Sequence, residues 1–162
     1  MSAREIARTG VLCALAAVLG YIESLLPPFV PVAGFKIGLS NIAVMYVLCR
    51  IGKRQAFFVM LVKVLITSLW FSGLNALIYS LFGGIAAYFA MRAAMRLKMS
   101  LYGVGMCGGV FHNIGQLAAA CIMLGTARTL YLAPALLILG LAAGVVVGIV
   151  VRLLLRSTEK LL

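Results

Sequence analysis

The chain has 162 residues, of which 65% are hydrophobic and only 10% are charged. Soluble domains carry roughly 25% charged residues and about 45–50% apolar ones, so the polar groups here could not cover a folded surface in water. The net charge of +11 is typical of membrane proteins with basic cytoplasmic loops, and no basic stripe interleaves with aromatic residues as nucleic-acid binding requires. The composition predicts a single membrane-embedded domain over residues 1–162 and argues against a soluble enzyme.

Apolar segments follow one another along the chain, separated by short turns. We predict membrane-spanning helices over residues 7–26, 36–48, 55–71, 74–91, 102–124 and 130–151. Pro27, Pro28 and Pro31 cannot continue a helix, so they end the first segment. The second segment is short, and the apolar loop before it is expected to be partly embedded. The fold predicted is an all-α membrane protein, a compact bundle of about six transmembrane helices.

Basic residues are distributed unevenly between the turns of this bundle. Eleven of the 14 Lys and Arg residues fall on one side if the chain crosses six times: Arg4, Arg8, Arg50, Lys53, Arg54, Arg92, Arg96, Lys98, Arg152, Arg156 and Lys160. Lys36 and Arg128 lie near the opposite side, and Lys63 falls inside a span. Because basic loops stay in the cytoplasm, both termini are predicted to be cytoplasmic in a multi-pass protein of the cell membrane.

Small residues recur at intervals of four in several spans, which lets helix backbones approach closely in lipid. These residues are Gly10, Ala14, Ala86, Ala90, Ala94, Gly105, Gly109, Gly140, Gly144 and Gly148. They fit packing within the bundle, and they also fit the docking of a partner subunit on at least one ridge.

Four polar residues are predicted to lie deep in the membrane, where a charge costs about 2.5–3.5 kcal/mol. Lys63 is nine residues beyond Arg54, about 14 Å along a helix and therefore near the midplane. His112, Asn113 and Gln116 share the segment HNIGQ and are spaced to lie on one face of a helix. The group fits a ligand site that Lys63 joins, and it also fits a structural network of hydrogen bonds between helices.

A second polar group is predicted near the outer face. Glu23 lies near the outer end of the first span, Lys36 begins the second, and Asn41 follows. Glu23 and Lys36 could simply pair, or Lys36 and Asn41 could line the mouth of a cavity whose floor is Lys63 and His112. Asn75 is predicted at the same level, together with Trp70 and Tyr79, so Asn75 is a further candidate for ligand binding.

The chain lacks the usual machinery of catalysis. It has no Asp, no Ser-His-Asp set and no nucleotide-binding Gly-Lys-Ser/Thr loop. Its four cysteines lie apart in apolar runs, which indicates small core residues rather than a metal or redox site. We therefore expect no catalytic residue, no metal and no cofactor.

Two segments, GFKIGLSNI and GGVFHNIGQLAAA, resemble the Gx transporter family, often labelled heptaprenyl diphosphate synthase component I. That family is similar to the substrate-binding S components of energy-coupling-factor transporters. The resemblance implies a six-helix bundle, a lid between spans one and two, a transmembrane coupling subunit and two cytoplasmic ATPases. It also implies that a small-residue ridge on span one meets the coupling subunit, here Gly10, Ala14, Ala16, Ala17 and Gly20.

Two functions are consistent with these observations. The first is the substrate-binding membrane subunit of an energy-coupling-factor-type importer, for a small anionic amphiphile that would offer Lys63 a counter-charge. The second is a non-catalytic membrane accessory subunit in prenyl diphosphate or quinone metabolism, or in electron transfer. Prenyl-elongating enzymes of the usual kind carry aspartate-rich motifs that bind magnesium and diphosphate, and this chain has no Asp.

Overall fold

A computed structural model describes residues 3–25, 38–71 and 73–159, and within them it contains six α-helices, one 3-10 helix and no strand. The helices are α1 (Ala3–Leu25), α2 (Asn41–Arg50), α3 (Lys53–Phe71), α4 (Gly73–Arg96), α5 (Leu101–Leu124), η1 (Ala127–Leu132) and α6 (Ala133–Glu159). The all-α prediction is confirmed.

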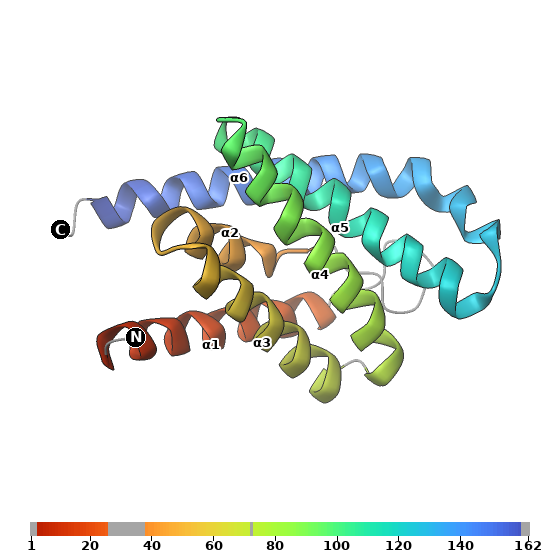
Figure 1. Ribbon diagram of the computed structural model, residues 1–162, viewed down its shortest axis with the longest axis horizontal. Helices are drawn as coiled ribbons and strands as arrows, with labels where there is room; N and C mark the ends of the chain where they lie inside the picture. Colours follow the sequence, from red (N-terminus) through yellow and green to blue (C-terminus); the bar gives the residue numbers. More distant parts are fainter. Residues whose placement is uncertain (1–2, 26–37, 72, 160–162) are drawn as a thin grey trace.

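The helices run back and forth along the long axis of the molecule (Figure 1). The start of α1, the α2–α3 turn and the end of α6 lie toward the left of that view, and the α4–α5 turn lies at its top, left of centre. The α3–α4 turn and η1 lie at the opposite end. Because the predicted basic turns and termini are those of the first group, we refer to that side as the basic end.

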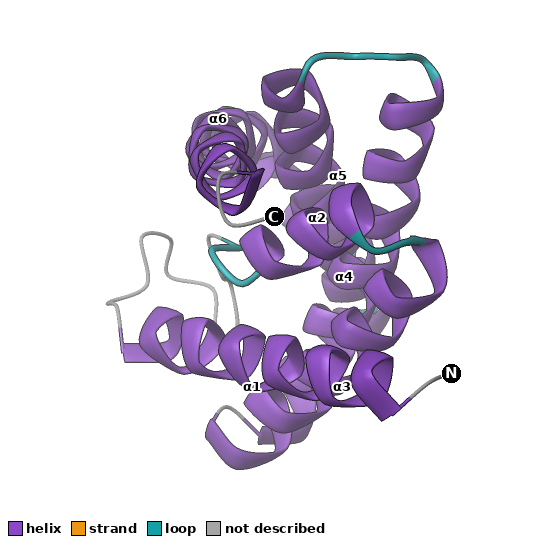
Figure 2. Ribbon diagram, turned by 90° about the vertical axis from the view of Figure 1, so that its left-hand side faces the viewer, coloured by secondary structure: helices purple, strands orange, loops and turns teal. Residues whose placement is uncertain are grey.

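The short helix α2 is the centre of the bundle rather than a full span. Its ten residues measure about 15 Å, roughly half of the ~30 Å hydrocarbon thickness of a bilayer. Seven of its residues are buried, and the view from the basic end shows the other helices around it (Figure 2). Such a helix is apolar on nearly every side because every side faces protein. The count of six complete crossings stays a prediction.

Glycines allow α5 and α6 to pack backbone against backbone. A Cβ added to Gly105 would lie 2.2 Å from the carbonyl oxygen of Gly144, and one added to Gly109 would lie 2.1 Å from that of Gly140. These distances leave no room for any side chain, so the small residues of α5 and α6 pack within the bundle. On α4, Ala94 is buried as well.

The distribution of polarity is the reverse of that in a soluble protein. Large apolar side chains are exposed, among them Trp70 (77%) and Val11 (69%), whereas Glu23 and Lys63 are buried. Four helical segments are long and apolar enough to cross a membrane: Glu5–Leu25, Gly73–Arg96, Leu101–Leu124 and Ala127–Thr158. A lipid environment explains the pattern, because lipid tolerates exposed Leu or Val and penalises exposed charge.

Five predicted boundaries need correction, and two of them are the start of the first helix at Ala3 instead of Ala7 and the end of the sixth at Glu159 instead of Val151. The second helix begins at Asn41, because residues 39–40 form a turn that closes with Gly38 accepting from the Asn41 amide. The fourth helix extends to Arg96 rather than Met91, since Arg, Ala and Met favour helix and basic residues suit a helix C-terminus. The sixth α-helix begins at Ala133, after a 3-10 segment.

Candidate functional site

Three helices bring a set of buried polar groups together in the interior. We call Glu23 of α1, Ser40 and Asn41 at the start of α2, and Lys63 of α3 the polar cluster. The Lys63 ammonium donates to Ser40 Oγ at 2.7 Å and to Asn41 Oδ1 at 2.8 Å. The Glu23 carboxylate accepts from the Gly38 amide and, at 3.4 Å, from the Ser40 hydroxyl. All four side chains are at least nine-tenths buried.

Ser40 is the central member of the polar cluster. It precedes α2, where a serine hydroxyl normally accepts from the amides of the first turn, but its side chain makes no such capping bond. Instead it accepts from Lys63 and donates to Glu23. A positive and a negative group are therefore joined through one hydroxyl, which offsets part of the cost of burying both.

The cluster borders a small cavity between α1, α3, α4 and α5. The residues that line it are Gly20, Glu23, Ser40, Lys63, Val64, Thr67, Ser80 and His112. Its volume is about 10 Å³, which is room for one water molecule at most. Small-molecule sites usually measure roughly 300–1,000 Å³, so a larger ligand could enter only if the surrounding helices moved apart.

The segment HNIGQ does not act as a single patch. His112 lines the same cavity as Lys63, and a ligand site shared by the two stays a prediction. Asn113 instead donates to the Leu136 carbonyl of α6 at 2.5 Å. Gln116 faces α4, where a Cβ on Gly83 would lie 2.9 Å from Gln116 Cγ. The same Cβ would lie 3.0 Å from His112 Cε1, so His112 and Gln116 share the face of α5 that packs on α4, whereas Asn113 faces α6.

Several buried polar atoms of α4 and α5 have no hydrogen-bond partner among the described residues. They are Ser80 Oγ, Asn113 Oδ1 and both amide heteroatoms of Gln116. Each such atom costs about 1–3 kcal/mol when nothing satisfies it. Apolar side chains could fill the same space without this free-energy cost. Polar groups that are retained inside a membrane protein despite such a cost usually mark function.

The remaining predicted ligand residues lie elsewhere. Asn75 is exposed on the first turn of α4 and is not among the residues that line the cavity. Lys36 falls outside the described residues, so its pairing with Glu23 stays a prediction. Asn41 lies deeper than expected, since it bonds to Lys63 itself. Sequence reasoning missed Ser40 and Ser80, although Ser40 stands directly before Asn41 in the motif GFKIGLSNI.

The proposed docking ridge on α1 is divided between two faces. Gly10 and Ala14 are exposed, and a Cβ at Gly10 would meet nothing within 4 Å. Ala17 is half-buried, while Ala16 and Gly20 are buried against the bundle. Of the expected ridge, Gly10 and Ala14 are therefore available on the surface.

The described residues do not offer an obvious metal centre. No three His, Cys, Asp or Glu side chains in residues 3–25, 38–71 and 73–159 come together as a group that could hold an ion. The four cysteines are free thiols, with Cys13 buried and the others half-buried.

An all-helical bundle with four helices long enough to cross a bilayer, apolar outside and charged inside, is the architecture of an α-helical membrane protein. The family model described as heptaprenyl diphosphate synthase component I matches residues 12–154, and the chain belongs to that family. The suspected family resemblance is thereby confirmed. Neither a curated protein nor a solved structure matches the chain significantly.

Proposed function

We propose that this protein is a non-catalytic membrane subunit that binds a small anionic amphiphile at the polar cluster. In this proposal it acts with partner proteins, as the substrate-binding subunit of an energy-coupling-factor-type importer. The observation that carries the proposal is the buried Glu23–Ser40–Lys63 arrangement beside the cavity. The chain has no nucleotide-binding loop, so a transmembrane coupling subunit and cytoplasmic ATPases would supply the energy.

The geometry refines how an anion would bind. Lys63 already has the Ser40 and Asn41 oxygens as acceptors, and Glu23 lies one hydroxyl away. An incoming carboxylate or phosphate would therefore replace these acceptors at the ammonium rather than neutralise a lone charge. The present bonds already gain from the charge of the ammonium, and an anionic acceptor adds the attraction between two opposite charges, so an anion can displace a hydroxyl and an amide oxygen.

Lys63→Met and Glu23→Gln should change the affinity for an anion in opposite directions. Lys63→Met removes the ammonium at nearly constant length and should abolish binding of the anion. Glu23→Gln removes the competing carboxylate and should strengthen it. Lys98→Met is the matched control for Lys63→Met, because it removes the same charge from an exposed turn residue.

Binding would be measured by native mass spectrometry of the purified protein, which also identifies a co-purifying small molecule. Thermal unfolding of each variant would show whether it folds. Lys63→Met leaves Glu23 buried without the cation, which costs about 3–5 kcal/mol, so Lys63→Met/Glu23→Gln, which removes both charges, repeats the test if Lys63→Met does not fold. A ligand that binds Lys63→Met as well as the wild type would refute the anion site, and stronger binding to Lys63→Met would point to a cation.

A second candidate function is favoured by the family's description as a synthase component. In that case the protein is a membrane accessory subunit in prenyl diphosphate metabolism, and its partner is a soluble catalytic chain. The absence of Asp leaves this chain without the carboxylates that hold magnesium and diphosphate in prenyl-elongating enzymes. Co-purification distinguishes the two candidates, since a coupling subunit supports the importer and a prenyl synthase supports the accessory role.

A further inference from the structure

A second and much wider depression lies open to the surface at the basic end of the bundle. It is lined by Leu48 of α2, Lys53 of α3, and Arg92, Met95 and Arg96 of α4. Its volume is about 310 Å³, compared with about 10 Å³ beside the polar cluster. This volume falls at the lower end of the range of small-molecule sites, which is roughly 300–1,000 Å³. We call it the basic cleft.

The local structure explains why three cations meet in the basic cleft. Arg92, Met95 and Arg96 are spaced three and four residues apart, so they share one face of α4. One turn earlier on that face, the Tyr88 hydroxyl donates to the Lys53 carbonyl at 2.9 Å. Tyr88 is 3% exposed, and this partly buried bond fixes α4 against the first turn of α3. The two helices that carry the three cations, α3 and α4, are therefore fixed relative to each other.

The charges of the basic cleft are not balanced by the protein. No acidic residue lines it, and within the described residues no ion pair engages Lys53, Arg92 or Arg96. Arg92 is half-buried, and no acidic residue lines the cleft beside it. In contrast, Arg152 near the same end donates to the Tyr102 hydroxyl and lies over its ring.

Orientation in the membrane accounts for basic residues at this end but not for this arrangement. The positive-inside rule requires only that cations lie in or near the loops, and exposed residues such as Lys98 and Arg156 satisfy it. It does not require three cations to converge on one cavity with two apolar side chains, Leu48 and Met95, in its wall. Neighbouring cations repel one another, and a bound anion lowers that repulsion.

We propose that the basic cleft binds the phosphate or diphosphate group of an amphiphilic molecule, with Leu48 and Met95 contacting its apolar part. Arginine presents several N–H donors in a planar fork that matches phosphate oxygens, and lysine adds a point charge. Two sources supply this chemistry, an anionic phospholipid headgroup and a soluble phosphate ester. The proposal is independent of ligand binding at the polar cluster.

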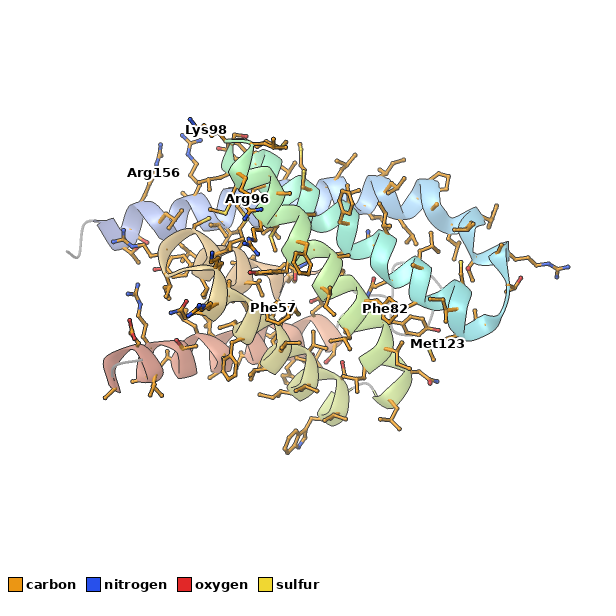
Figure 3. The ribbon with its side chains drawn as sticks, in the orientation of Figure 1. Phe57, Phe82, Arg96, Lys98, Met123 and Arg156 are labelled. Carbon is orange, nitrogen blue, oxygen red and sulfur yellow. The ribbon has the colours of Figure 1, made fainter. Side chains whose placement is uncertain are left out.

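The test compares two double variants that each remove two positive charges from the same end. Arg92→Gln/Arg96→Gln removes two cations of the basic cleft. Lys98→Gln/Arg156→Gln removes two exposed cations that lie at the basic end, and neither lines the cleft (Figure 3). Each protein is reconstituted in nanodiscs of phosphatidylglycerol and phosphatidylcholine, and the retained lipid is identified by native mass spectrometry. A parallel titration in detergent uses inorganic pyrophosphate as the soluble probe.

Wild-type protein and the control should retain phosphatidylglycerol or bind pyrophosphate equally well. One hydrogen bond to a charged group is worth about a tenfold change in affinity, so the cleft variant should bind at least ~10-fold more weakly. Retention of phosphatidylglycerol identifies a lipid site, and binding of pyrophosphate alone identifies a soluble ligand. Equal losses in both double variants, or no binding of either probe to wild type, would overturn the proposal.

Folding is checked by size-exclusion chromatography and by the midpoint of thermal unfolding. If the double cleft variant does not fold, Lys53→Gln with Arg54→Gln as its control repeats the comparison. Both residues are exposed on the first turn of α3, and only Lys53 lines the basic cleft. Loss of anion binding in Lys53→Gln alone supports the site, and identical behaviour of the two variants refutes it.

Discussion

Replacing Gly109 by alanine tests how closely α5 and α6 are packed. In an ordinary helix this change stabilises, because glycine in a helix interior costs about 0.5–1 kcal/mol relative to alanine. Here the new Cβ would lie 2.1 Å from the Gly140 carbonyl oxygen, which is 1.3 Å short of the 3.4 Å where ordinary contact begins. Both sides of the contact are helix backbone, so no side-chain rotation can relieve it.

The helices must therefore separate, and the separation would also disturb the Asn113–Leu136 hydrogen bond one turn away. Overpacking costs typically 1–3 kcal/mol and a lost buried hydrogen bond about 1 kcal/mol more, so Gly109→Ala should destabilise the protein by about 2–4 kcal/mol. Gly10→Ala is the control, since its Cβ would meet nothing within 4 Å. It should leave the protein unchanged or stabilise it by up to about 1 kcal/mol.

The free energy of unfolding can be measured by titration with a denaturing detergent. The native cysteines serve as reporters, because buried Cys13 should react with a fluorescent maleimide only after unfolding. The same added methyl group should lower the free energy of unfolding at Gly109, and at Gly10 it should leave that free energy unchanged or raise it. A Gly109→Ala protein as stable as the wild type would show that α5 and α6 are not packed at this distance.

Three further predictions concern topology, partner binding and the wall of the basic cleft. In protein whose native cysteines have been replaced, cysteines at Ser72 and Thr126 should be labelled from outside the cell. Labelling of both only from the cytoplasmic side would contradict the predicted orientation. Ala14→Leu should weaken co-purification with a coupling subunit by obstructing close approach at an exposed position, while the fold survives; unchanged co-purification would argue against this ridge. Tyr88→Phe removes the hydroxyl that bonds to the Lys53 carbonyl and should cost about 1 kcal/mol in unfolding titrations, and an unchanged midpoint would mean that this bond does not hold α4 to α3.

The sequence alone determined the class of structure and the position of most helices. Composition requires a non-aqueous environment, and turns and prolines separate the apolar segments, because both signals are local. The third and fifth helices, Lys53–Phe71 and Leu101–Leu124, lie within two residues of their predicted bounds. The spacing of Gly105 and Gly109 likewise predicted close helix packing, which the short contacts with α6 confirm.

Only the tertiary structure decided which polar groups meet. Ser40 and Lys63 are 23 residues apart, and Asn113 and Leu136 are also 23 apart, so helical periodicity carries no information about either contact. The sequence therefore predicted that Lys63 is buried but did not identify Ser40 as its partner. Lys53 and Arg92 were recognised as basic turn residues, yet their convergence on one cleft depends on how α4 crosses α3. Burial can be predicted from local composition, whereas a binding site depends on the relative placement of helices that are distant in sequence.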